Sequence, residues 1–219
     1  MLWHKLQGVG GIGTVTVPSI VDSNSAFSET TGSQTLSIAA PDVSADDYVV
    51  IIMTVNSSLA ITALGNLTGW TQDIYETSTA ERLLVLSTTV VGNETWIGGN
   101  IQCTVAAQYA ACVFSVRGAT TKLVGSFNSN TLSSVVLSSI SPSEASLLLA
   151  LSASDNIGTV TSVVNSTYTF SSVVESSGAT TLAGEAAVYS TEVEAGATGP
   201  VTVAIDTGNG LAGVLMAFS

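Results

Sequence analysis

The sequence has very little positive charge. Its 219 residues contain four lysine and arginine residues against 16 aspartate and glutamate residues, so the formal net charge is −12 at pH 7. Four cations cannot neutralise a run of phosphates, which excludes nucleic-acid binding. An anionic membrane surface would repel the chain for the same reason. We therefore expect neither nucleic acid nor membrane among its partners.

Long apolar runs are also missing. The longest, Tyr48–Met53 and Leu147–Leu151, are as long as strands and far below the ~20 residues that a membrane-spanning helix needs. The first residues include lysine but no continuous apolar stretch, so we expect no secretory signal peptide. The chain is therefore predicted to be made in the cytoplasm of the cell that produces it.

Histidine and cysteine are too scarce for common catalytic and metal sites. There is one histidine, His4, and two cysteines, Cys103 and Cys112. A Ser-His-Asp site would have to take its base from the terminal segment, although that base must be held rigidly. The two cysteines flank a predicted hairpin around residues 106–110, where a disulfide stays open as an alternative to two buried thiols. We expect no cofactor and no enzymatic activity.

Carboxylates are the remaining candidates for acid–base chemistry. Glu192 and Glu194 are two positions apart and are predicted to share a strand face. A glycosidase needs two carboxyl groups about 5–10 Å apart in a cleft, but the 13 aromatic residues do not cluster around these acids. Calcium remains an alternative for two acidic loops, because carboxylate oxygens suit that ion. These loops carry Asp42, Asp46 and Asp47, and Asp206 and Asn209.

Serine, threonine, valine and isoleucine dominate the rest. The 59 serine and threonine residues, together with the β-branched apolar residues, favour pleated sheets. Apolar runs of strand length alternate with glycine, asparagine and aspartate turns, and no segment shows a helical stripe. We interpret the N-x-S/T sequons, at Asn56, Asn66, Asn93 and Asn165, as turn residues. The predicted strands are Ser33–Ala39, Tyr48–Val55, Thr71–Glu76, Arg82–Val91, Trp96–Val105, Ala111–Arg117, Leu132–Ile140, Ser146–Ser154, Thr167–Glu175, Ala183–Val193, Pro200–Asp206 and Leu211–Phe218.

The pattern of the first half recurs in the second. An apolar strand at 49–53 is followed by Trp70, and the strand at 147–151 is followed in the same order by Tyr168. We predict an all-β fold of two similar tandem antiparallel β-sandwich units, of jelly-roll or Ig-like type, that arose by internal duplication and span residues 19–118 and 122–219. Trp70 and Tyr168 should occupy equivalent positions, and the short join between the units should hold them together.

Residues 1–18 differ from all that follows and are predicted to form a glycine-rich docking arm. Its apolar anchors are Leu2, Trp3 and Leu6, and Lys5 adds positive charge at one end of an acidic chain. The segment 8–13 matches G-x-G-x-x-G, but the following residues predict a strand and not the helix that a dinucleotide site requires. The alternative is that the arm adds a strand through residues 14–17 to its own sheet.

Three segments together resemble β-sandwich structural proteins of tailed-bacteriophage particles. They are the acidic loop and strand at 41–50, Gly69-Trp70-Thr71, and the strand with its flanks at 110–118. The likeness covers residues 36–118 and, more loosely, 137–219. It implies a virion location, a homo-oligomer, and the major capsid protein or other virion proteins as partners, and it carries over no active-site residue.

Two functions follow as hypotheses. The first is a non-enzymatic virion structural protein, in particular a capsid decoration protein (a cement or spike protein). The alternative is a tail appendage or adhesin module that binds a host-surface glycan. A glycan binder should expose two or three of the aromatic residues on a concave face, whereas a decoration protein should bury them. The residues that separate the two hypotheses are Trp70, Tyr75, Trp96 and Tyr168.

Overall fold

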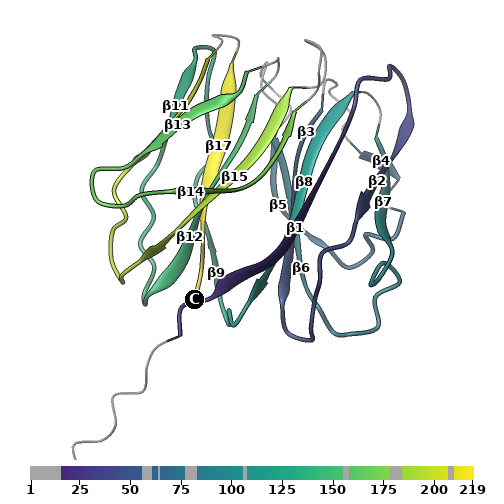
Figure 1. Cartoon of the computed structure of the whole chain (residues 1–219), viewed down its shortest axis with the longest axis horizontal. Helices are drawn as coiled ribbons and strands as arrows, with labels where there is room; N and C mark the ends of the chain where they lie inside the picture. The colour runs from purple at the N-terminus through teal and green to yellow at the C-terminus, as the bar shows by residue number, and fades with distance from the viewer. Residues whose placement is uncertain are drawn as a thin grey trace, which may run out of the picture.

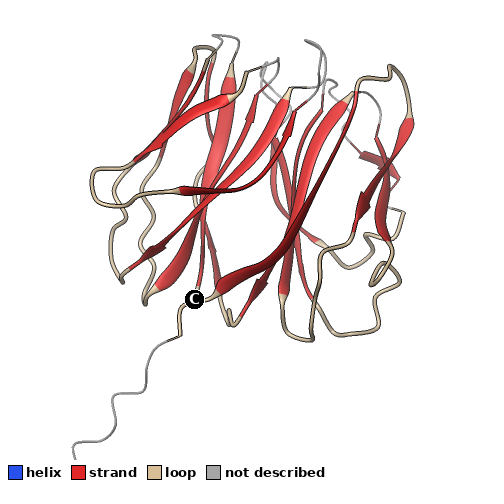
Figure 2. Cartoon of the chain, in the orientation of Figure 1, coloured by secondary structure: helices blue, strands red, loops and turns tan. Residues whose placement is uncertain are grey.

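The protein is built of antiparallel strands joined by turns. The structure, a computed structural model, describes residues 16–55, 61–63, 65–76, 83–105, 108–154, 158–177, 184–206 and 210–219. These residues contain strands and loops and no helix (Figure 2), which confirms the predicted all-β class. No segment of the described chain is therefore a helix with the length and apolar character of a membrane span.

Residues 19–117 form two sheets. The larger sheet has the strand order β1-β8-β3-β6-β5 and the smaller one the order β2-β7-β4, with every neighbouring pair antiparallel. The strands are β1 (Ser19–Ser28), β2 (Gln34–Ala39), β3 (Tyr48–Val55), β4 (Ile61–Ala63), β5 (Thr71–Glu76), β6 (Leu83–Thr89), β7 (Asn100–Val105) and β8 (Tyr109–Arg117).

Residues 122–218 form two further sheets with a matching strand order. The larger has the order β10-β17-β12-β15-β14, with β9 also paired to β17, and the smaller has the order β11-β16-β13. The strands are β9 (Lys122–Val124), β10 (Asn128–Asn130), β11 (Ser134–Leu137), β12 (Ser146–Ser154), β13 (Val160–Val164), β14 (Ser171–Ser177), β15 (Glu185–Val193), β16 (Val201–Ile205) and β17 (Leu211–Phe218).

The four sheets stack as four layers with three apolar cores between them. In Figure 1 the two small sheets lie at the outer sides, marked by β11 and β13 at one side and β2, β4 and β7 at the other, and the two large sheets lie between them. Side chains of β3 alternate between two of these cores: Val49 and Ile51 pack toward the small sheet, and Val50 and Ile52 toward the other large sheet. Strands covered on both faces must be apolar throughout, which is why the central strands are continuous apolar runs.

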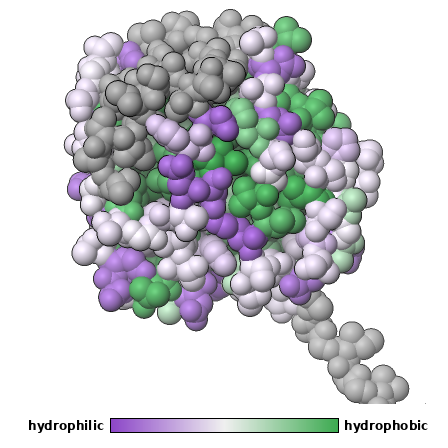
Figure 3. Space-filling model, turned by 180° about the vertical axis from the view of Figure 1, so that it is seen from behind, coloured by the Kyte–Doolittle hydropathy of each residue, from purple (hydrophilic) through white to green (hydrophobic). Residues whose placement is uncertain are grey.

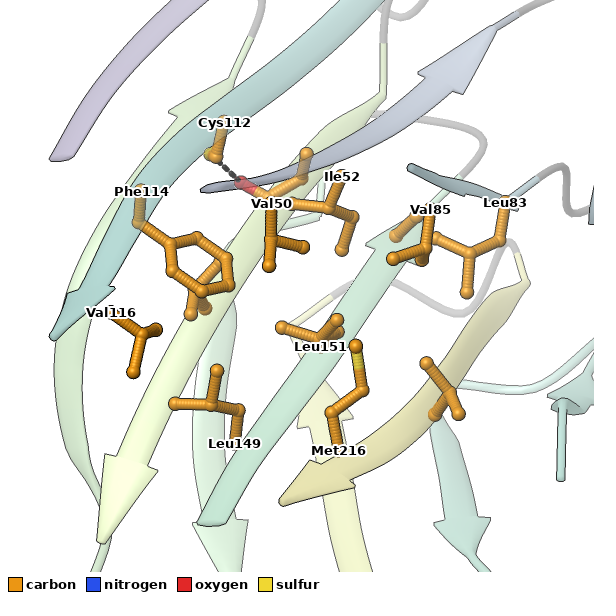
Figure 4. Close-up of a cluster of buried hydrophobic side chains, with 14 of the residues drawn as sticks. Val50, Ile52, Leu83, Val85, Cys112, Phe114, Val116, Leu149, Leu151 and Met216 are labelled. Carbon is orange, nitrogen blue, oxygen red and sulfur yellow. Dashed lines mark hydrogen bonds between the residues drawn. The ribbon is translucent and has the colours of Figure 1, made fainter. Parts of the chain in front are cut away.

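The middle core joins the two halves of the chain. Phe114 and Val50 from the first half point toward Leu149 and Met216 from the second (Figure 4). The thiol of Cys112 donates a hydrogen bond to the carbonyl oxygen of Ala186 in the other half, with 3.2 Å between the two atoms. The expectation that the halves pack against each other is therefore confirmed, and they do so face to face through their large sheets.

The two large sheets lie against each other in reversed strand order. Edge strand β1 lies beside edge strand β14, and β8 lies beside β15. At the opposite edge, Lys122 of β9 reaches Asp73 of β5. Ser176 of β14 also donates a hydrogen bond to the carbonyl oxygen of Ala26 in β1, at 2.8 Å. Each edge strand of one large sheet thus faces the opposite edge of the other large sheet. The same arrangement occurs in an isologous contact between two like subunits.

β-Bulges recur at matching places in the two halves. The register of β5 shifts between Gln72 and Ile74, and that of β14 shifts between Ser172 and Val174. Strands β4 and β13 each carry one such shift as well. A bulge bends a strand and re-aims its side chains, so matching bulges give the two halves matching strand curvature.

The join between the halves is short and hydrogen-bonded. The backbone N–H groups of Thr120 and Thr121 donate to the carbonyl oxygen of Ser219, at 2.6 and 2.8 Å. Gly118 has a φ of +83°, a conformation that glycine adopts without strain, and Ala119 is buried in the middle core. The join therefore fastens the last residue of the chain to the boundary between the halves.

Candidate functional site

A surface hollow lies on the first half of the chain. It has a volume of about 570 Å³ and lies where the turn before β5 meets the end of β6 and the connection between β6 and β7, residues 90–99. We call it the Trp70 hollow. The side chains that define it are Thr68, Trp70, Thr88, Thr89, Glu94 and Trp96.

Two indole rings form the apolar part of the hollow. Trp96 lies in the turn that precedes β7, is 1% exposed and belongs to the core of the first half. Trp70 directly precedes β5 and is partly buried against the same core. The ring centroids are 5.9 Å apart and the planes are tilted by 59°, a favourable arrangement for an aromatic pair. Trp96 therefore packs against the ring of Trp70 from the side of the core.

Glu94 places a fixed negative charge on the hollow. Its two carboxylate oxygens accept the backbone N–H groups of Val91 and Gly92, at 2.6 and 2.9 Å. Burial acts to raise the pKa of Glu94, but backbone hydrogen bonds, that from Val91 first, outweigh it and lower the pKa below its ordinary value. The group is therefore an anion at neutral pH.

Asn66 lines the hollow but serves to anchor its loop. Its side-chain oxygen accepts the N–H of Gln102 at 2.7 Å, and its amide nitrogen donates to the carbonyl oxygen of Asn100 at 2.8 Å. At the neighbouring Gly65, which has a φ of +56°, an added Cβ would lie 2.1 Å from the carbonyl oxygen of Gln102, so only glycine fits. The turn is thus clamped onto β7.

Asn165 ties its own turn to the segment before β16 in the second half, and its side-chain oxygen accepts the N–H groups of Thr167 and Tyr168. Its amide nitrogen donates to the carbonyl oxygens of Thr198 and Pro200, both at 3.0 Å, just before β16, the counterpart of β7. Asn66 and Asn165 are therefore structural amides that hold turns, as interpreted from the sequence. Asn93 lies in the connection at 90–99, and Asn56 lies outside the described residues.

Several polar side chains of the hollow have no hydrogen-bond partner among the residues that the structure describes. The hydroxyl groups of Thr68, Thr88, Thr89 and Thr95 and the amide of Asn93 line the hollow, and none of them hydrogen-bonds to another of the residues that the structure describes. A threonine hydroxyl can both donate and accept. The hollow thus offers free hydrogen-bonding groups around an aromatic ring.

The acidic loop considered for calcium is arranged differently. Asp47 is 2% exposed, and its carboxylate accepts the N–H of Ser44 and pairs with the guanidinium of Arg117 at 2.8 Å. Asp46, with a φ of +71°, and Asp42 are not gathered around a common point with it: within the described residues, no three His, Cys, Asp or Glu side chains are placed to hold a metal ion. Asn209, of the second acidic loop, lies outside those residues.

The predicted hairpin between the cysteines is wrong. Cys103 lies on β7 of the small sheet and Cys112 on β8 of the large sheet, so the two strands belong to different layers and the chain crosses between them. Both thiols are free and buried, which is the alternative that we favoured over a disulfide. The two strands follow one another in the chain but belong to two sheets that share one core.

We expect both thiols to be unreactive in the folded protein. Burial raises the pKa of Cys103 to about 12, and burial, with a smaller contribution from the charge of Glu185, raises that of Cys112 as well. Because the thiolate is the reactive form, Ellman's reagent at pH 8 should label neither cysteine in native protein and both in denaturant. Labelling of native protein at the rate of an exposed thiol would contradict this expectation.

Other predicted site residues fall into two groups. Glu192 and Glu194 are exposed to solvent at the end of β15. The docking residues of the arm, together with His4 and the glycine motif at 8–13, lie outside the described residues. The docking residues are Leu2, Trp3, Lys5 and Leu6.

Sequence reasoning named both indoles of the hollow but missed its polar part. Thr88 and Thr89 sit at the end of an apolar strand and resemble any other strand-terminal threonines. Glu94 follows Gly92 and Asn93, which are typical of a turn, and the carboxylate of Glu94 closes that turn.

Comparison of the chain with protein-family models, with curated protein sequences and with solved structures found no match.

Proposed function

We propose that the protein is a non-enzymatic structural component of a virion, most directly a capsid decoration protein of a tailed phage. The observation that carries the proposal is the use of both faces of both large sheets for internal packing, with Trp96, Phe114 and Phe218 fully buried. Such a body resists deformation because its cores are continuous through four layers. By the criterion set from the sequence, burial of Trp96 favours this function, whereas Tyr75 is exposed and Trp70 and Tyr168 are only partly buried.

The outer surface is consistent with a part that faces solvent. Its apolar side chains lie in separate patches among polar ones on the face shown in Figure 3. Two of the four basic residues are engaged in ion pairs, Arg117 with Asp47 and Lys122 with Asp73. A surface rich in hydroxyl groups and net acidic charge keeps such a part soluble at high local concentration.

An internal duplication, giving two jelly-roll or Ig-like units at 19–118 and 122–219, belongs to the same proposal. Three observations support it: the matching strand orders, the matching bulges, and the paired clamps of Asn66 and Asn165. Trp70 and Tyr168 pack against the cores of their own halves and precede β5 and β14, in line with the predicted equivalence. An ancestral unit that paired through its large sheet would give the reversed strand order seen here.

The N-terminal arm is proposed to dock the protein onto its assembly. Leu2, Trp3 and Leu6 would bury apolar surface against the major capsid protein, another virion protein or a second copy in a homo-oligomer, at about 25 cal/mol per Å². Ordering the segment would offset part of this gain, so docking should be helped by contacts of the body. The proposed place of action is the virion.

Deletion of residues 1–12 tests the proposal. The truncated protein should keep its thermal unfolding midpoint, because the described body begins at residue 16, and should be absent from purified particles made in its presence. Trp3→Ala should lower occupancy to an intermediate level. Occupancy equal to that of the full chain, or unfolding of the truncated body, would contradict the docking role.

A further inference from the structure

We propose that the Trp70 hollow binds a neutral sugar, with the indole of Trp70 as the platform for one pyranose ring. This activity is separate from the structural role above and does not rest on it. Four features of the hollow support this binding: its size, its aromatic platform, its unpaired hydroxyl groups and its charge.

The size fits one or two sugar rings. Pockets for small ligands are generally about 300–1,000 Å³ and combine aromatic lining with a few polar groups. The hollow, at about 570 Å³, lies in this range and has both kinds of lining. Its backbone is held by the Asn66 clamp and by the N–H groups that Glu94 accepts. The site is therefore preformed, which lowers the entropy lost on binding.

The platform is Trp70, and Trp96 is its support. Trp96 is fully buried and needs no ligand to explain it, because it fills the core of the first half. Trp70 is different, since part of its ring lies on the hollow. The C–H face of a pyranose ring can pack flat on an aromatic face, which removes apolar surface of both groups from water.

The hydroxyl groups of the hollow match those of a sugar. Thr68, Thr88, Thr89 and Thr95 have no partner among the described residues, and each can donate and accept one hydrogen bond with an equatorial or axial hydroxyl group. Asn93 adds an amide with both capacities. A purely apolar ligand would leave these groups without partners, at a cost in free energy.

Charge selects among sugars. Glu94 is held as an anion, and the whole chain carries a net charge of −12. A sialic or uronic acid would meet repulsion from both. A neutral hexose or N-acetylhexosamine avoids this repulsion and could donate a hydroxyl group to a free lone pair of Glu94.

The two tryptophans of the hollow occur in only one half of a molecule whose two halves otherwise correspond. The matching connection in the second half, residues 194–200 between β15 and β16, contains no tryptophan, and the counterpart of Trp70 is Tyr168. Folding requirements common to both halves therefore do not account for the hollow. A feature that only one of two similar units carries is a candidate for function.

The test is titration of the full chain with neutral and charged oligosaccharides. The probes are maltotetraose, cellotetraose, mannotetraose and chitotetraose, with 3′-sialyllactose as the anionic comparison, and the readout is the indole N–H resonance of Trp70. At least one neutral probe should shift this resonance with a Kd between about 0.1 and 10 mM, and sialyllactose should not. Trp70→Ala, followed through the resonances of neighbouring backbone amides, should weaken binding at least about tenfold.

Two further variants separate binding from folding. Thr88→Val keeps the shape of the side chain and removes its hydroxyl group, so it should weaken binding without loss of fold even if Trp70→Ala proves unstable. Tyr75→Ala removes an exposed aromatic ring on β5 that is not part of the hollow and should leave binding unchanged. No shift with any neutral probe at about 20 mM, or binding that survives both Trp70→Ala and Thr88→Val, would overturn the proposal.

Discussion

Replacing Lys122 with methionine is expected to lower the free energy of unfolding by about 3–5 kcal/mol. Lys122 of β9 donates from its ammonium group to Asp73 of β5 at 2.5 Å and to the hydroxyl of Ser87 at 2.6 Å. The side chains of Lys122 and Asp73 are only 16% and 5% exposed. The substitution would therefore leave a carboxylate buried without its cation.

The geometry of the pair explains the size of the effect. Asp73 sits at the bulge of β5, between the shifted positions Gln72 and Ile74, and the bulge leaves it outside the regular register of the strand. Its second carboxylate oxygen is buried and has no hydrogen-bond partner in the described part of the chain, so no other described group compensates the loss of Lys122. The pair also connects the two halves of the chain at one edge of their interface.

A double-mutant cycle measures the interaction itself. Lys122→Met with Asp73→Leu replaces both charges with apolar groups, and the double variant should be more stable than Lys122→Met alone, because no unpaired charge remains. Chemical denaturation of the four proteins at pH 7 provides the values. Equal destabilisation by the single and the double variant would show that the ion pair has no energetic role.

The central strands were predictable because both of their faces are buried. The expected bounds of β3, β12 and β17, which lie inside the two large sheets, match those observed. A strand between two cores needs apolar side chains at every position, and such a run, ended by turn residues, gives a strong signal. The turn residues also mark where these strands stop.

The strands that were missed are those with little buried surface. No residue of β1, the polar strand at 19–28, is fully buried, and the same holds for β9, β10 and β13. These strands lie at sheet edges or in the small outer sheet. Their pairing is set by the neighbouring strand and not by their own hydrophobicity, so tertiary context decides where the local pattern is weak.

The candidate site was predictable only in part for a related reason. Trp70 was expected at the start of a strand, and it directly precedes β5. Trp96 was expected to begin a strand, but it lies in a turn four residues before β7, where it fills the core. Thr68, Thr88 and Glu94 reach the hollow from three segments: the turn before β5, the end of β6, and the connection at 90–99. The pattern of a single sequence does not indicate which distant segments come together in the fold.

Stability is also expected to fall as the pH rises from about 4.5 to about 8, because of Glu185. This carboxyl group at the start of β15 is 2% exposed. Burial, with smaller contributions from the charges of Glu175 and Asp206, raises its pKa to about 8, while a hydrogen bond from the N–H of Val160, at 3.1 Å, acts in the opposite direction. In the unfolded chain a glutamate has a pKa of about 4.3.

The sign follows from proton binding. Between these two pKa values the folded state holds a proton that the unfolded state has released, so each rise in pH favours unfolding. The stabilising contribution of the neutral group is fully present below about pH 4 and is lost by about pH 8. At about 1.4 kcal/mol per pKa unit, the loss amounts to about 3–5 kcal/mol.

Glu185→Gln should remove this loss, because an amide is neutral at every pH and can still accept from Val160. The variant should lie within about 1 kcal/mol of the parent protein at pH 5 and exceed it by several kcal/mol at pH 8.5, as measured by denaturant unfolding. Glu192→Gln, an exposed position on the same strand, is the matched control and should follow the parent at both pH values. The parent protein and Glu185→Gln share every other carboxylate, so the difference between their two curves isolates Glu185. A constant difference between Glu185→Gln and the parent across this range would mean that Glu185 is already ionised in the folded protein at pH 5.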